Sequence, residues 1–80
     1  MVAHETTDEL REDLRRVEAD LAVLRTQVAQ LRRAIGERWD APRDNEDLSS
    51  MLTTAEEQEA VIAVLEARCE ALLRRLGEEV

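Results

Sequence analysis

Residues 10–35 read LREDLRRVEADLAVLRTQVAQLRRAI, and this stretch decides the fold. Apolar residues recur in it at alternating steps of four and three. That spacing puts two apolar side chains per heptad on one face of a helix, which is the seam of a coiled coil. The stretch is therefore predicted to form one long helix with a continuous apolar seam. The seam residues are Leu10, Leu14, Val17, Leu21, Leu24, Val28, Leu31 and Ile35.

The second half of the chain carries the same rhythm, so the two halves can pack against each other. Folding the chain back near Arg43 sets Leu10 opposite Leu76 at one end and Ile35 opposite Met51 at the other. Each facing pair then joins an a position to a d position, as an antiparallel seam requires. We therefore predict an all-α fold, an antiparallel helical hairpin of two long helices with a heptad seam. The seam residues of the second half are Leu48, Met51, Ala55, Gln58, Ile62, Leu65, Cys69, Leu72 and Leu76.

Charged residues beside the seam give a second indication of this register. In an antiparallel pair the e positions face each other across the seam, and so do the g positions. Opposite charges then meet in three places, whereas Glu18 falls near Glu66. Exposed ion pairs are worth only about 0.2–1 kcal/mol each, so they select the register more than they stabilise it. The expected pairs are Asp13 with Arg75, Asp20 with Arg68, and Arg25 with Glu59.

Capping residues and helix breakers predict where the helices begin and end. Thr6 and Glu9 fit a capping box, so the first helix is expected over about 7–37. The segment 38–52 holds the only proline and breaks the apolar rhythm, so it is expected to be the connection, with a short helical turn near 45–51. The second helix is then expected over about 53–76.

The start of the second helix has two candidate positions in the sequence. Asp44 or Asn45 would cap a helix that keeps the seam intact through its first turns, whereas Thr53 and Glu56 form a better capping box about ten residues later. We favour the later start on the strength of that box. Gly77 is expected to end the helix in a left-handed conformation.

Length and composition restrict the class of protein. A chain of 80 residues with one tryptophan and no phenylalanine or tyrosine cannot build the aromatic-rich interior of a globular enzyme, so one helical domain is expected. No apolar run of about 18 residues and no secretory signal is present, which favours a cytoplasmic protein without a membrane partner. All eleven basic residues are arginines, which is typical of GC-rich bacterial coding sequences. Cys69 lies at a seam position and is expected to pack as a small apolar residue.

A second copy of the chain is the expected partner of the hairpin. Two helices bury little apolar surface, whereas ordering the chain costs roughly 1.5 kcal/mol of conformational entropy per residue. A lone hairpin is therefore only marginally stable. A homodimer in the form of a four-helix bundle would cover the remaining apolar surface. The alternative is that alanine fills exposed positions as a strong helix former. The expected dimer face is Ala60, Val61, Ala63, Val64, Ala67, Ala71 and Leu73, with a similar outer strip of Ala19, Ala22, Val23 and Ala29 on the first helix.

Gln58 is the one polar residue among the seam positions of the second half. Polar residues at such positions often set the register or the oligomeric state of a coiled coil. Gln58 lies toward the connecting end of the hairpin, so solvent exposure is the alternative reading.

Negative charge is concentrated around the connection. Residues 37–59 hold eight acids and two arginines, a net charge of −6 out of −8 for the whole chain. Acids in the first turn of a helix interact favourably with its dipole, which accounts for about half of this excess. The rest is expected to meet a basic protein partner, because direct binding of nucleic acid requires a basic stripe that the chain lacks. The expected partner-binding residues are Trp39, Asp40, Asp44, Glu46 and Asp47.

The residues needed for catalysis or cofactor binding do not occur in suitable patterns. The only histidine, His4, precedes the first helix, so neither a zinc site nor a Glu-x-x-His di-iron pair is available. Read as a calcium loop from Asp40, the connection has Asn45 where glycine is required and Met51 where glutamate should close the site. We therefore expect no enzyme, no metal site and no cofactor.

Two resemblances follow from these features. A helical hairpin with acids near its turn, here Asp40, Asp44, Glu46 and Asp47, resembles the coiled-coil arm of the Gre and DksA-type transcription factors. That likeness implies a regulator acting on RNA polymerase. In charge and length the chain is also similar to small phage inhibitors that mimic nucleic acid. The leading expectation is a non-catalytic coiled-coil interaction module that forms a homodimer and docks its acidic turn on a basic protein.

Overall fold

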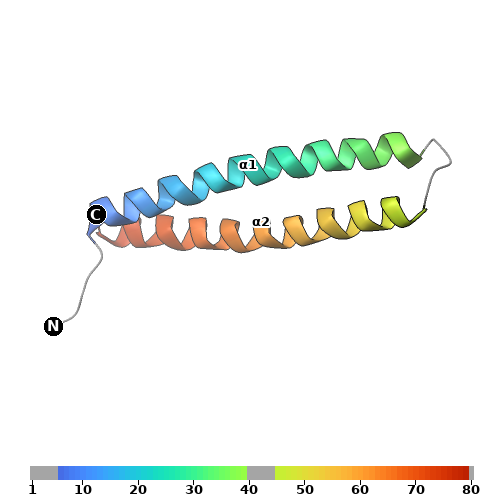
Figure 1. The fold of residues 1–80 in the computed structure, drawn as a ribbon. Coiled ribbons are helices and arrows are strands. Elements are labelled where there is room, and N and C mark those ends of the chain that lie inside the picture. Colours follow the sequence, from blue (N-terminus) through green and yellow to red (C-terminus); the bar gives the residue numbers. More distant parts are fainter. Residues whose placement is uncertain (1–5, 40–44, 80) are drawn as a thin grey trace.

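The computed structural model describes residues 6–39 and 45–79, without the side chains of residues 38, 39, 45, 46 and 79. Two helices, α1 (Thr7–Trp39) and α2 (Asn45–Glu79), lie side by side and run in opposite directions (Figure 1). The first residues of α1 and the last of α2 share one end of a rod that measures 61 × 20 × 14 Å. The predicted antiparallel helical hairpin is confirmed.

The start of α1 shows the predicted cap. The Glu9 backbone N–H donates to the Thr6 Oγ1 at 3.1 Å, and the Leu10 N–H donates to the Thr6 carbonyl oxygen at 3.0 Å. The first bond satisfies an N–H group that has no partner within the helix, and the second is the first i→i−4 bond of the helix. Asp8 and Glu9 in the first turn add a favourable interaction with the helix dipole. The helix therefore starts at Thr7, as the sequence predicts.

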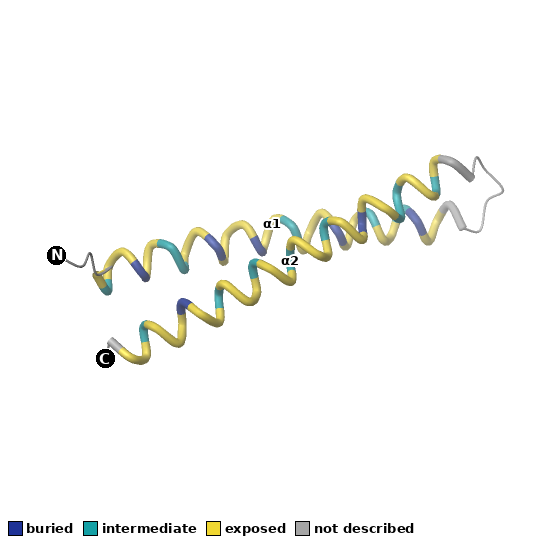
Figure 2. The backbone as a smooth tube through the Cα atoms, turned by 90° about the horizontal axis from the view of Figure 1, so that it is seen from below, coloured by how far each residue is buried: buried dark blue, intermediate teal, exposed yellow. Residues whose placement is uncertain are grey.

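The core of the hairpin is the predicted heptad seam. In Figure 2 buried segments recur along α1 with exposed segments between them, and the two helices cross, as in coiled-coil packing. One core cluster near the chain ends contains both members of four predicted facing pairs, from Leu10 with Leu76 to Leu21 with Leu65. The buried residues of the described part are Leu10, Val17, Leu21, Val28, Ile35, Ala55 and Leu72, all of them at predicted seam positions.

The predicted start of the second helix is wrong. Helix α2 begins at Asn45 rather than near 53, so it takes in most of the segment that was expected to be the connection. The seam explains the difference, because Leu48 and Met51 become half-buried and Ala55 is 0 % exposed when the helix starts early. Thr54 lies inside the helix, and its Oγ1 donates to the Ser50 carbonyl oxygen at 3.0 Å. Apolar burial along the seam outweighs the local capping signal.

The expected left-handed stop at Gly77 is also wrong. Helix α2 continues to Glu79, and no glycine of the described chain has a positive φ. Gly36 likewise lies within α1, which extends to Trp39. Both glycines therefore adopt helical geometry, and the helix continues past each of them.

The ion pairs between the helices differ from the expected ones by one heptad. Arg25 binds Glu66 at 2.8 Å rather than Glu59, and Glu59 binds Arg32 at 2.5 Å. Side chains on a helix lean toward its N-terminus. Residue 61 faces Arg25 in the seam register, so Arg25 and Glu66 lean toward each other across about 1.4 turns.

On the other side of the seam, Arg68 lies 3.5 Å from Asp13 rather than beside Asp20. Asp13, which was expected to pair with Arg75, forms its ion pair with Arg68. These two side chains lean apart along their helices, which agrees with the longer distance. The register of the seam is as predicted, but the long arginine side chains choose partners that heptad positions alone do not specify.

Candidate interaction surfaces

The ion pairs divide the hairpin into two flanks that differ in chemistry. We call the side of the seam with the pairs Arg25–Glu66 and Arg32–Glu59 the paired flank. The opposite side, which carries the Asp13–Arg68 pair near the chain ends, is the valine flank. Val61 belongs to the valine flank because it lies one heptad before Arg68, and residues seven apart share a helix face.

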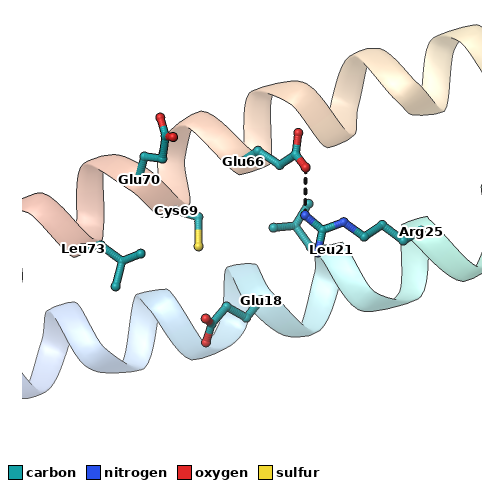
Figure 3. A pocket seen from close by; sticks show the side chains of 7 residues that line it. All are labelled: Glu18, Leu21, Arg25, Glu66, Cys69, Glu70 and Leu73. Atoms are coloured by element: carbon teal, nitrogen blue, oxygen red, sulfur yellow. Dashed lines mark hydrogen bonds and ion pairs between the residues drawn. The ribbon is translucent and has the colours of Figure 1, made fainter.

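The paired flank contains a shallow groove between the helices (Figure 3). The Cys69 sulfur points toward α1 from its floor, and Leu73 lies beside it with 53 % of its surface exposed. Glu18, Glu66 and Glu70 stand around the opening, and Arg25 donates to Glu66 across it at 2.8 Å. Cys69 is half-buried in the seam, as expected of a small apolar residue.

Arg32 and Glu59 make the closest ion pair of the paired flank. The guanidinium donates to both carboxylate oxygens, from Nη2 at 2.5 Å and from Nε at 3.4 Å. This hydrogen bond raises the pKa of Arg32 above its usual value, and the charge of Glu56 adds to the effect. The pair therefore ties α1 to α2 on this side, while both side chains stay more than two-fifths exposed.

The valine flank carries most of the exposed apolar surface. Val23, Val61 and Val64 are 56 %, 48 % and 68 % exposed. Val23 lies level with residue 63 in the seam register, so the three valines occupy the same short section of the rod. Helical spacing turns all three toward this flank, because Val23 and Val64 occupy the c positions next to the g row. We call these three side chains, one on α1 and two on α2, the valine patch.

The expected dimer face is exposed throughout, but it does not lie on one side of the hairpin. All seven of its residues are exposed. Val61 lies on the valine flank, however, whereas Leu73 lies in the groove of the paired flank. A single flat interface cannot cover both. The grouping of Val23 with Val61 and Val64 was not predicted, although their heptad positions and level in the register would have revealed it.

Gln58 lies within the seam rather than in solvent. It is half-buried, and its Oε1 is buried and accepts no hydrogen bond within the described chain. Val28, which faces it in the register, offers no donor and is 8 % exposed. A buried carbonyl oxygen without a donor destabilises the fold, so this position departs from the apolar rule of the seam.

The expected partner-binding residues are only partly described. Asp40 and Asp44 lie outside the described residues, as do the side chains of Trp39 and Glu46. Asp47 is exposed in the first turn of α2 and takes part in an interaction of its own. Asp47 lies at the N-terminal, positive end of the α2 dipole. This agrees with the expectation that part of the negative charge in residues 37–59 interacts favourably with that dipole.

No family model, curated protein or solved structure matches the chain. Within the described residues, no group of three or more histidine, cysteine, aspartate or glutamate side chains could hold a metal ion. Neither described helix is long and apolar enough to cross a membrane.

Proposed function

We propose that this chain is a non-catalytic coiled-coil interaction module that forms a homodimer and presents its acidic connection end to a basic protein. The exposed apolar side chains carry the proposal. Four large ones, Val23, Val61, Val64 and Leu73, are each about half exposed or more. Scattered apolar residues on a surface are ordinary, but three of these four gather at one level of the rod.

The six consecutive apolar residues 60–65 support the same proposal. A helix that is apolar on all sides is usually covered on all sides. In the hairpin only Ile62 and Leu65 of this run face α1, and Val61 and Val64 remain exposed. A second hairpin would remove the exposed members of this run from water and would form a four-helix bundle of the usual two-fold type.

The molar mass in solution tests the dimer. Light scattering over a range of micromolar concentrations is expected to give twice the 9.1 kDa of one chain. Unfolding should also depend on protein concentration, because dissociation is part of the reaction. A mass of one chain at every concentration, together with concentration-independent unfolding, would contradict the dimer.

The charge distribution supports docking on a basic protein. Residues 37–59 carry a net charge of −6, whereas the flanking segments carry −1 each. A field of one sign at one end of a rod attracts a basic surface and speeds association. Asp40, Asp44 and Glu46 contribute three of these negative charges.

Charge reversal tests this second part of the proposal. The triple variant Asp40→Lys, Asp44→Lys and Glu46→Lys is expected to lose partners captured from a lysate at low salt, with helicity unchanged by circular dichroism. Reversal of Asp8, Glu9 and Glu12 at the other end of the rod is the matched control. Capture of RNA polymerase would favour the resemblance to Gre and DksA-type factors. Equal capture by wild type and the tip variant would contradict docking through this end.

A further inference from the structure

We infer that two copies of this chain pack through their valine flanks around a two-fold axis parallel to the rod, so that both acidic connection ends lie at the same end of the dimer. The inference rests on the proposed homodimer and adds the surface and the orientation.

The choice of flank follows from the cost of removing charge from water. The paired flank holds Arg25, Arg32, Glu59 and Glu66 in its central section, and their ion pairs are about half exposed. Covering that flank would desolvate all four charges, which the existing pairing offsets only in part. The valine flank presents uncharged Val23, Gln27 and Val61 at the same level. An apolar partner surface therefore fits the valine flank better.

The valine patches fit each other when the axis runs along the rod. Such an axis sets α1 of one copy against α2 of the other and keeps every residue at its own level. Val23 lies level with residue 63, so it meets Val64 of the second copy within about 1.5 Å along the axis. The symmetry repeats this contact, and the two patches together cover Val23, Val61 and Val64, which a single hairpin leaves exposed.

With the axis parallel to the rod, charged residues beside the valine patch also face residues of opposite charge in the second copy. On the valine flank α1 carries Asp13 and Asp20, whereas α2 carries Arg68 and Arg75. With α1 against α2, Asp20 comes within two residues, or about 3 Å along the axis, of Arg68 of the second copy. An axis perpendicular to the rod would instead set α1 against α1 and place Asp20 opposite Gln27. The carboxylate would then lose its arginine, which disfavours that orientation.

One force opposes the parallel axis. It brings together two ends that each carry a net charge of −6. Salt screens exposed charges beyond about 8 Å at 0.15 M ionic strength, so the repulsion is weak at physiological salt. The doubled acidic end would be a stronger target for a basic partner.

Matched glutamate variants of the full chain test the flank. Val64→Glu is expected to weaken dimer association by about 100-fold in light scattering, because each dimer would bury two carboxylates without partners. Leu73→Glu, at a comparably exposed position on the paired flank, should leave the mass at two chains. If wild type is monomeric, the proposed dimer itself fails. If wild type is dimeric and Leu73→Glu dissociates it, or if Val64→Glu does not, only the choice of flank fails.

Complementary charge reversals test the pairing across the interface. Asp20→Arg and Arg68→Asp are expected to weaken each homodimer, whereas an equimolar mixture should form the heterodimer in excess of the statistical share. In that heterodimer both contacts between copies regain opposite charges. Contacts within each chain, including the Asp13–Arg68 pair that Arg68→Asp breaks, are the same in the homodimers and in the heterodimer. Native mass spectrometry with one copy isotope-labelled measures the share. A statistical mixture would overturn the pairing.

The distance between the two connection ends tests the axis directly. A nitroxide label on Ser49→Cys, in a Cys69→Ala background confirmed as dimeric, reports the separation of residue 49 in the two copies by pulsed electron resonance. Axes parallel to the rod give about 20–30 Å, set by the width of a bundle of helices 8–10 Å apart. Axes perpendicular to it give more than about 40 Å, set by the rise of the helices. The longer distance would overturn the inference.

Discussion

Gln58 shows how one side chain can depart from the pattern that builds the fold. Its position has seam spacing, and its neighbours along the seam, Ala55 and Ile62, are apolar. The amide nevertheless brings a buried oxygen that accepts no hydrogen bond within the described chain. In coiled coils such polar seam residues reduce stability while they exclude other registers and oligomeric states. Gln58 is thus a candidate for a residue that specifies pairing.

Replacing Gln58 by leucine is expected to stabilise the protein and to make its assembly less specific. Removal of the unpaired oxygen should raise the free energy of unfolding by about 1–2 kcal/mol in urea titrations. Gln58→Glu, with nearly the same shape, should lower it because a charge would enter the seam. Light scattering of the leucine variant should show species other than the wild-type one. A leucine variant less stable than wild type would contradict this account.

The two helices keep their regular geometry through residues that usually end helices. Gly36 lies three residues before the end of α1 and has a negative φ, and a Cβ added to it would meet no atom within 4 Å. The seam residue directly before it, Ile35, is only 7 % exposed and holds this part of α1 against α2. Packing along the whole element therefore overrides the weak helix propensity of one glycine.

Gly36→Ala is expected to stabilise α1. Alanine loses less backbone freedom than glycine when the helix forms, so the free energy of unfolding should rise by roughly 0.5–1 kcal/mol. Circular dichroism during thermal unfolding measures the change. Ala29→Gly, at an exposed position one heptad earlier, is the reverse control and should lower stability by a similar amount. A destabilising Gly36→Ala would indicate that this position is covered in the assembled protein.

As a whole the molecule is a rod whose two flanks differ in chemistry, one with ion pairs between the helices and the other with exposed valines. The paired flank joins α1 to α2 through Arg25–Glu66 and Arg32–Glu59. The valine flank leaves Val23, Val61 and Val64 exposed at one level of the rod. Exposed ion pairs contribute little to stability, so the paired flank mainly holds the register. The valine flank is where the proposed assembly gains apolar burial.

The ion pair of Arg32 is expected to act independently of pH near neutrality. The folded-state pKa of Arg32 is raised, so its contribution is fully present below the unfolded-state pKa and is lost only as pH rises through the folded-state value. Both values lie far above neutrality. The difference in unfolding free energy between wild type and Arg32→Gln should therefore stay constant from pH 6 to 9 and shrink in 1 M salt.

Arg33→Gln is the control for that experiment. Arg33 is exposed beside Arg32 and carries the same charge, but it lies farther from the seam. Its replacement should leave stability nearly unchanged under all of these conditions. A pH-dependent difference for Arg32→Gln in this range would show that another titrating group controls the pair.

The sequence by itself determined the helical hairpin, its seam and its antiparallel register, because heptad spacing repeats over many turns and each repeat adds to the same signal. It also determined the cap at Thr6, which depends on neighbouring residues alone. The tertiary structure decided where α2 begins, since burial of Leu48 and Met51 outweighs a local capping box at Thr53. It also decided which acids the arginines bind. That choice depends on how side chains lean and on which residues stand level across two helices, and spacing along one helix does not contain that information.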